Sequence, residues 1–320
     1  PFNQKPMSSE TTKTNYPALY TLITVFFFWG FIAAGNSIFI PFCKSYFSLD
    51  QFQSQLVDFA FYTAYYLGAL LLFAFGALNG KDLVGKWGYK RSIVYGLLFS
   101  ALGAGAMILA VQANVYAGML VGLFIVALGF SLQQTVANPL AIALGPIATG
   151  SQRLTLAGGI NNLGTTIGPL IVSFAIFGSS ASSDTNMSIE SVKIPYLILG
   201  AAFLLVAVFL KFSSLPDKPQ AIVESDSEAA STKSSALKYP QLVLGMIAIF
   251  VYVGVEVSTA SNLPAYMEKN LGFLTKDIAP YISLYWASLM IGRWTGAVEA
   301  FTENMNMQKI LRFVAPYVAF

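Results

Sequence analysis

Long apolar runs recur along almost the whole chain, and they restrict its fold more than any other feature. A helix needs about 20 apolar residues to cross the hydrocarbon core of a bilayer. Hydropathy predicts eight such spans, at 17–43, 54–79, 91–112, 115–146, 154–178, 193–212, 239–267 and 276–300. The residues from Lys309 onwards have the pattern of the beginning of a ninth span. The sequence therefore predicts an all-α polytopic membrane protein.

Composition agrees with this class and excludes several functions. The chain is 56% hydrophobic and 10% charged, whereas a soluble domain is about a quarter charged. It has no His and a single Cys, Cys43, which excludes disulfide pairs, Cys/His metal sites and Ser–His or Cys–His catalysis. The formal charge of +3 is spread over short loops and indicates no nucleic-acid partner. We expect a protein that is not an enzyme and that has no cofactor or structural metal.

The distribution of positive residues predicts the orientation in the membrane. Cytoplasmic loops of membrane proteins carry an excess of Lys and Arg. With a cytoplasmic N-terminus, 14 of the 18 Lys and Arg residues fall on the inner side. The outer side then keeps Lys44, Lys193, Lys269 and Lys276. This asymmetry predicts a multi-pass protein whose N-terminus is cytoplasmic.

One polar segment divides the apolar spans into two groups. Residues 213–238 are rich in Ser, Pro and charge, which is typical of a flexible linker. The predicted organisation is a tail at 1–16, a six-helix bundle at 17–212, the cytoplasmic linker at 213–238 and a partial second bundle at 239–320. The segments "AGNSIFIPF" (34–42) and "STASNLPAY" (258–266) are weak echoes of each other. Two related bundles predict a transporter with its site at their interface.

Six motifs carry a resemblance to a known family. They are "FFFWGFIAAGNSIFIP" (26–41), "GKWGYKRSIVYGL" (85–97), "QQTVANPLAIALGP" (133–146), "RLTLAGGINNLGTTIGP" (153–169), "YVGVEVSTAS" (252–261) and "YWASLMIGRWTGA" (285–297). In this order they resemble the fucose–hexose–proton symporter family of the major facilitator superfamily. The resemblance implies a two-bundle fold of twelve spans, of which this chain holds about eight to nine. It also implies import of a monosaccharide such as glucose or galactose by cation symport with alternating access. The expected setting is the bacterial inner membrane, where the protein is a monomer surrounded by lipid.

The resemblance also suggests sugar-binding residues. It implies that Trp29 lines the sugar cavity and that Asn161 bonds sugar hydroxyls. Ser37 stands where the fucose branch carries an acid, Gln134 stands where it carries another, and Gly158 replaces a glutamine. The departure at Ser37 argues against a direct transfer of the fucose branch's proton mechanism. Those at Gln134 and Gly158 argue against fucose specificity, and Gln134 matches the glucose/galactose branch.

Sugar recognition also needs hydroxyl-directed amides and an aromatic face. We expect Asn36, Gln134 and Asn161 to bind substrate together with Trp29. The alternative for each amide is a structural hydrogen bond to a neighbouring helix, and this reading is favoured for Gln133, Asn138 and Asn162.

Asp58 and Glu256 are the acids that lie well inside the predicted spans, and Glu299 lies near a cytoplasmic end. Charge inside a span is costly and usually functional. Glu256 lies roughly 16 Å below the outer end of its helix, near the middle of the membrane. Either it couples a cation or lines the cavity, or it is structural, as an ion pair or as a protonated carboxyl bonded to a helix. Asp58 lies at about the depth of Ser37, so Asp58, Asn36 and Ser37 form a candidate H⁺ or Na⁺ site. The alternative for Asp58 is a carboxylate that reaches the membrane interface.

The loop "GKWGYKR" resembles the superfamily's cytoplasmic motif that latches the bundles. Asp82, Arg91 and Arg293 are the candidate latch residues, and plain positive-inside anchoring is the alternative. Two other functions stay open. "GTTIGP" (164–169) partly matches a signature of efflux antiporters, and a transporter fold can also serve as a non-transporting sensor.

Overall fold

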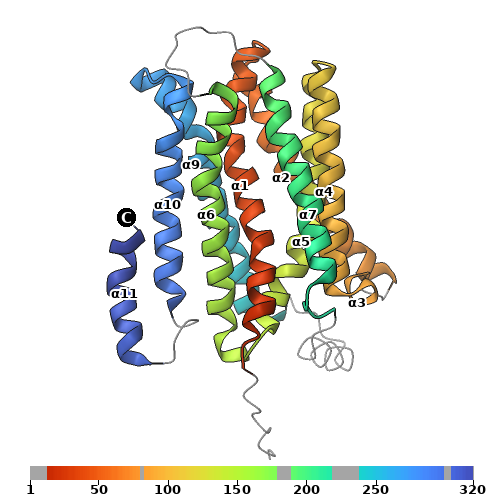
Figure 1. Cartoon of the computed structure of the whole chain (residues 1–320), viewed down its shortest axis with the longest axis vertical. Helices are drawn as coiled ribbons and strands as arrows, with labels where there is room; N and C mark the ends of the chain where they lie inside the picture. The colour runs from red at the N-terminus through yellow and green to blue at the C-terminus, as the bar shows by residue number, and fades with distance from the viewer. Residues whose placement is uncertain (1–12, 80–82, 179–188, 218–237, 299–303, 320) are drawn as a thin grey trace, which may run out of the picture.

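The computed structural model describes residues 13–79, 83–178, 189–217, 238–298 and 304–319. Long helices run side by side along the long axis of the molecule (Figure 1). Their bounds are α1 (Tyr16–Tyr46), α2 (Gln51–Asn79), α3 (Leu83–Trp87), α4 (Tyr89–Gln112), α5 (Tyr116–Ala143), α6 (Gly150–Phe177), α7 (Lys193–Phe212), α9 (Pro240–Leu271), α10 (Ala279–Gly296) and α11 (Met305–Ala319). We call the end where α1 begins the lower end, and the opposite end the upper end.

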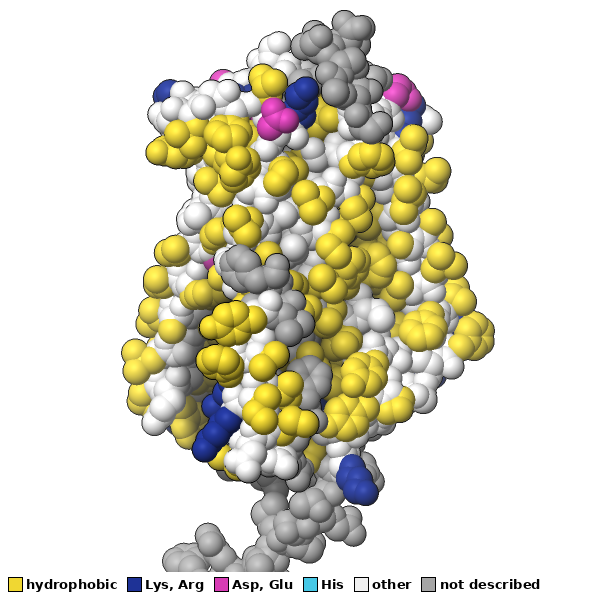
Figure 2. Space-filling model, turned by 60° about the vertical axis from the view of Figure 1, so that its left-hand side comes forward, with side chains coloured by type: hydrophobic (Ala, Val, Ile, Leu, Met, Phe, Trp, Pro, Cys, Tyr) yellow, Lys and Arg dark blue, Asp and Glu magenta, His cyan; other side chains and the backbone are white. Residues whose placement is uncertain are grey.

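The predicted spans are helices, which confirms the all-α membrane class. Within the described residues, seven helices are long and apolar enough to cross a membrane, and α10 and α11 add two shorter ones. Figure 2 shows apolar side chains over the middle of the visible face and most charged side chains near its two ends. The span predicted at 115–146 ends earlier, at Ala143, because Gly145 and Pro146 do not continue a helix.

The first group of helices, α1 to α7, is held together partly by glycines. A Cβ on Gly30 would lie 2.0 Å from the carbonyl oxygen of Asn161. A Cβ on Gly164 would lie 2.1 Å from the carbonyl oxygen of Phe27, and one on Gly168 would lie 2.5 Å from that of Phe31. Gly164 and Gly168 form the small-xxx-small pattern with which membrane helices approach closely. The α1–α6 contact therefore depends on the absence of side chains at these positions.

Arg153 has a structural role. The sequence predicted it only as one of the positive residues on the inner side. Its side chain is 1% exposed. It donates to the carbonyl oxygens of Ala141 at 3.1 Å and Pro146 at 2.9 Å, and to the hydroxyl of Thr149 at 2.7 Å. Ala141 lies in the last turn of α5, where carbonyls lack partners within their own helix, and Pro146 and Thr149 lie in the turn between α5 and α6. Arg153 thus ties α6 to the end of α5.

The second group, α9 to α11, meets the first group in two places. Helix α10 packs along α6, and α9 contacts α1. Ala34 of α1 is buried in one cluster with Ala260 and Met267 of α9 and with Ile282 and Trp286 of α10. The predicted boundary of the groups at 213–238 stays a prediction, since 218–237 lies outside the described residues.

Candidate functional site

Asp58 joins the two groups of helices. Ser261 of α9 donates its hydroxyl to one carboxylate oxygen of Asp58. The amide nitrogen of Asn36 lies 3.5 Å from the other oxygen. The pairing crosses 203 residues of sequence. The acid predicted to sense a cation therefore also bridges α2 and α9.

A groove between α2 and α9 runs past this bridge. Its volume is about 650 Å³, within the range of small-molecule sites. Asp58 and Tyr62 line it from α2, and Ser258, Ser261 and Asn262 line it from α9. The rest of the lining is mostly apolar, including Phe59, Phe250 and Val253, and the groove is open to its surroundings. Its few polar groups, an aromatic ring, amide and hydroxyl groups and one acid, are of the kinds that sugar recognition uses.

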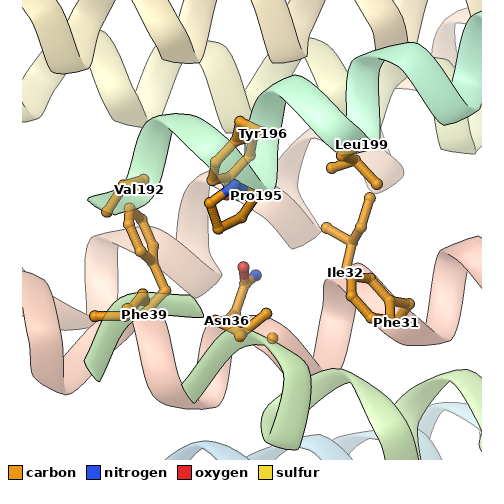
Figure 3. A pocket seen from close by; sticks show the side chains of 11 residues that line it. Phe31, Ile32, Asn36, Phe39, Val192, Pro195, Tyr196 and Leu199 are labelled. Carbon is orange, nitrogen blue, oxygen red and sulfur yellow. The ribbon is translucent and has the colours of Figure 1, made fainter. Parts of the chain in front are cut away.

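Asn36 also faces a second, much smaller cavity. Figure 3 shows its side chain pointing from α1 toward Pro195 and Tyr196 of α7. The cavity measures about 40 Å³, which suits water rather than a hexose. Asn36 reaches Asp58 as expected, while its proposed contact with sugar stays a prediction.

Ser37, the third residue of the predicted cation site, takes no part in the hydrogen bonds of Asp58. Its side chain is buried in α1, and among the described residues it makes no hydrogen bond with Asp58. Ser261 takes the place that we expected of Ser37. Ser261 lies in the motif "YVGVEVSTAS", but the sequence does not predict its role because its partner, Asp58, lies in a distant helix.

Trp29 is buried in this structure, and its expected place in the sugar cavity stays a prediction. Its indole is 2% exposed and donates to the side-chain oxygen of Gln133 at 3.0 Å. The amide of Gln133 in turn donates to Ser100 at 3.1 Å. The ring therefore packs α1 against α5. Gln133 has the interhelical role that the sequence favoured for it.

Asn161 and Gln134 are both half-buried and accessible in part. The amide of Asn161 donates to the backbone oxygen of Phe26 at 3.0 Å. The amide of Gln134 lies 3.3 Å from the hydroxyl of Tyr65. Each keeps its side-chain oxygen outside these bonds, so both remain predicted sugar contacts.

Glu256 forms an ion pair with Arg293. Its carboxylate lies 3.6 Å from the guanidinium, and Arg293 also lies 3.4 Å from the hydroxyl of Tyr252. Tyr285 donates to the backbone oxygen of Glu256 at 3.0 Å. A Cβ on Gly158 of α6 would lie 2.6 Å from the guanidinium, so Arg293 touches the first group as well. The contacts favour the structural ion pair over a free coupling acid.

One of the predicted latch residues, Arg91, is paired within the first group of helices. Arg91 pairs with Asp217, which follows α7, at 3.4 Å. Asp217 also accepts from the backbone nitrogen of Arg91 at 3.2 Å and caps the start of α4. Asp82 lies outside the described residues, so its part in a latch stays a prediction.

Comparison with known proteins identifies the family of this chain. The sequence profile of the Major Facilitator Superfamily matches residues 18–318. This chain belongs to the major facilitator superfamily. It is 37% identical over 298 residues to the glucose/galactose transporter of Brucella abortus, which covers 91% of this chain and 69% of that protein.

A second relative and its crystal structure agree with the first. The chain is 30% identical over 294 residues to the L-fucose-proton symporter of Escherichia coli, covering 86% of this chain and 65% of that protein. The crystal structure of a variant of that symporter superposes with a TM-score of 0.60 at 25% identity, over 89% of this chain and 71% of the other. The resemblance drawn from the motifs is therefore confirmed. The relatives are transporters, and the chain is not an enzyme.

Proposed function

We propose that this chain imports a neutral hexose, such as glucose or galactose, together with a proton. The observation that carries the proposal is Asp58, an intramembrane acid that bridges two helix groups beside a groove of sugar size. The relatives named glucose/galactose transporter and L-fucose-proton symporter support it. The transport cycle is alternating access, in which the groups rock about a site between them.

Protonation of Asp58 weakens its hydrogen bond with Ser261, which joins α2 to α9. Hydrogen bonds to a charged oxygen are roughly twice as strong as those between neutral groups. A proton on Asp58 removes the charge and loosens its bond with Ser261. The α2–α9 contact then opens more easily and the groove becomes accessible. Proton binding couples to sugar binding because it favours the sugar-competent conformation.

The neighbours of Asp58 favour a proton over Na⁺. A metal cation needs several oxygen lone pairs directed at one point. Asn36 presents its amide nitrogen to Asp58, and Ser261 presents a donor hydroxyl. Both neighbours therefore stabilise the carboxylate itself and offer few ligands to a metal.

We further propose that the lower end faces the cytoplasm of a bacterium and that the protein acts as a monomer in the inner membrane. Lys90 and Arg91, at the start of α4, lie at this end, as does Lys211 at the end of α7. Their positive charge agrees with the positive-inside rule. The matched glucose/galactose and fucose transporters are bacterial.

The test is uptake of glucose, galactose, fucose and N-acetylglucosamine by proteoliposomes under a proton or a sodium gradient. We expect hexose accumulation with the proton gradient alone. Asp58→Asn should reduce this accumulation at least about tenfold, because the amide cannot take up a proton, while sugar counterflow persists. Asp50→Asn is the matched control, since Asp50 lies just before α2 and its cap on Gln53 survives in an amide.

Three results would overturn the proposal. Counterflow of none of these sugars would favour a sensor or an exporter of other compounds. Accumulation driven by sodium alone would replace the proton. Full proton-driven accumulation by Asp58→Asn would remove Asp58 from coupling.

A further inference from the structure

Four buried side-chain atoms have no protein hydrogen-bond partner among the described residues. They are Nδ2 of Asn162, Oγ of Ser283, Nε1 of Trp286 and Nε1 of Trp294. All four belong to α6 or α10, the helices that pack against each other between the two groups. Buried donors are almost always paired, so a concentration of unpaired ones at one contact calls for an explanation.

The register of α6 and α10 places these groups along one line. The helices run antiparallel, because a Cβ on Gly159 would meet Trp294 at 2.3 Å and one on Gly296 would meet Thr155 at 3.8 Å. Ser283, Trp286 and Trp294 are spaced to share one face of α10. Asn162 lies about one helical turn above Gly159.

Trp294 differs from the other three in what it touches. Its Nε1 would lie 2.4 Å from a Cβ on Gly159, so the indole rests directly on the backbone of α6. The explanation for its unpaired nitrogen is close packing at the lower end. We call the remaining three residues, Asn162, Ser283 and Trp286, the donor row.

Trp286 lies where both groups meet. It is 7% exposed and packs in the cluster of Ala34 and Ala260. Ala34 precedes Asn36 by two residues, and Ala260 directly precedes Ser261, so Trp286 lies near the Asp58 bridge. Trp29 uses its indole nitrogen on Gln133, whereas the indole nitrogen of Trp286 is unpaired by protein.

We propose that the donor row binds the sugar, with the indole of Trp286 covering the ring and its N–H donating to a hydroxyl oxygen. This inference rests on the proposed function and adds contacts from α6 and α10 to the site, since none of the three residues lines the α2–α9 groove. Sugar hydroxyls supply the acceptors that the three donors lack, and an indole face covers the apolar CH groups of a pyranose. The row is covered in the present conformation. It becomes accessible when α10 separates from α6 and from Ala34 of α1, as alternating access requires.

The test compares Trp286→Phe with the matched control Trp294→Phe in reconstituted full-length protein. Phenylalanine keeps an aromatic face and removes only the N–H. The probes are glucose and its 2-, 3-, 4- and 6-deoxy analogues, with KM and kcat measured separately for each. We expect Trp286→Phe to raise KM for glucose about threefold to tenfold, the effect of one neutral hydrogen bond. For one deoxy analogue, the one that lacks the hydroxyl bonded by Trp286, KM should be the same in Trp286→Phe as in the unmodified protein.

That selectivity separates a sugar contact from a structural role. Equal losses for glucose and every analogue would overturn the inference, as would unchanged KM values in Trp286→Phe. The same pattern in Trp294→Phe would also overturn it, because that nitrogen rests on Gly159. If the unmodified protein transports none of these sugars, the proposed function itself fails, and that result is distinct from a failure of the donor row.

Binding can be measured independently of transport by fluorescence. The chain has four Trp residues. A protein carrying Trp29→Phe, Trp87→Phe and Trp294→Phe reports on Trp286 alone. Glucose should change its emission in a saturable manner, whereas absence of any change at saturating glucose would contradict the contact.

Discussion

At the scale of single residues, hydrogen-bond and ion-pair partners distinguish side chains that can couple a proton from side chains that are structural. Glu256 and Asp58 are both acids within apolar helices, yet their surroundings differ. Glu256 faces the fixed positive charge of Arg293 in its own group of helices. Asp58 faces two neutral donors, one of them in the other group. A proton therefore changes the interactions of Asp58 across the interface, while Glu256 stays paired.

Glu256→Gln should destabilise the protein without abolishing proton coupling. The change leaves Arg293 without its carboxylate, at a cost of about 1–3 kcal/mol for an unsatisfied polar group. Because the side chain of Arg293 is 33% exposed, we expect the lower part of this range. Thermal unfolding in detergent measures the loss.

The double variant Glu256→Gln, Arg293→Gln is the control, and it should recover part of the lost stability because no charge is left unpaired. Loss of proton-driven uptake in Glu256→Gln at unchanged thermal stability would instead make Glu256 a coupling acid.

At the scale of helices, the start of α4 depends on a residue from beyond α7. Gly88 precedes α4 with a φ of 91°, a left-handed conformation that favours glycine, and it offers no side-chain cap. Asp217 supplies the cap through the backbone nitrogen of Arg91, and its backbone oxygen accepts from Tyr89 at 2.7 Å. A Cβ on Gly88 would lie 2.7 Å from the Asp217 carboxylate. The "GKWGYKR" loop is therefore fastened to the segment that follows α7.

Asp217→Ala should lower the free energy of unfolding by about 1 kcal/mol, the usual value of a lost helix cap. Asp217→Asn is the matched control because asparagine caps equally well but carries no charge. It should lose only the small contribution of the exposed pair with Arg91. Chemical or thermal denaturation of both variants gives the comparison. Equal losses in the two variants would assign the effect to charge instead of capping.

At the scale of the whole molecule, the two groups touch near both ends. Near the upper end, Asp58 and Ser261 connect α2 and α9. Near the lower end, Gly158 and Gly159 receive Arg293 and Trp294 of α10. Alternating access requires these contacts to break in turn.

A disulfide across the lower contact should stop transport. A Cβ on Gly296 would lie 3.8 Å from Cγ2 of Thr155, so cysteines at these two positions would lie close to each other across the contact. We expect the double variant Thr155→Cys, Gly296→Cys to lose sugar uptake on oxidation and to regain it on reduction. The native Cys43 is buried and should not react. Thr155→Cys alone is the control, and full transport by the cross-linked protein would show that the lower contact need not open.

The helices and the family follow from the sequence for a simple physical reason. A bilayer offers no partners to backbone groups, so long apolar runs must form helices. The order of the six motifs then identified the superfamily. Asp58 and Glu256 were recognised because acids are rare in such runs.

Only the tertiary structure decided which polar groups meet. The spans are apolar around most of their circumference, so hydropathy alone does not say which way each helix is turned. Asp58 with Ser261, Trp29 with Gln133 and Arg91 with Asp217 each join distant parts of the chain. The sequence by itself determined a helical membrane transporter and its rare polar residues. The packing of the helices decided that Trp29 bonds to Gln133, that Asp58 bridges two groups, and that the indole nitrogen of Trp286 has no protein partner among the described residues.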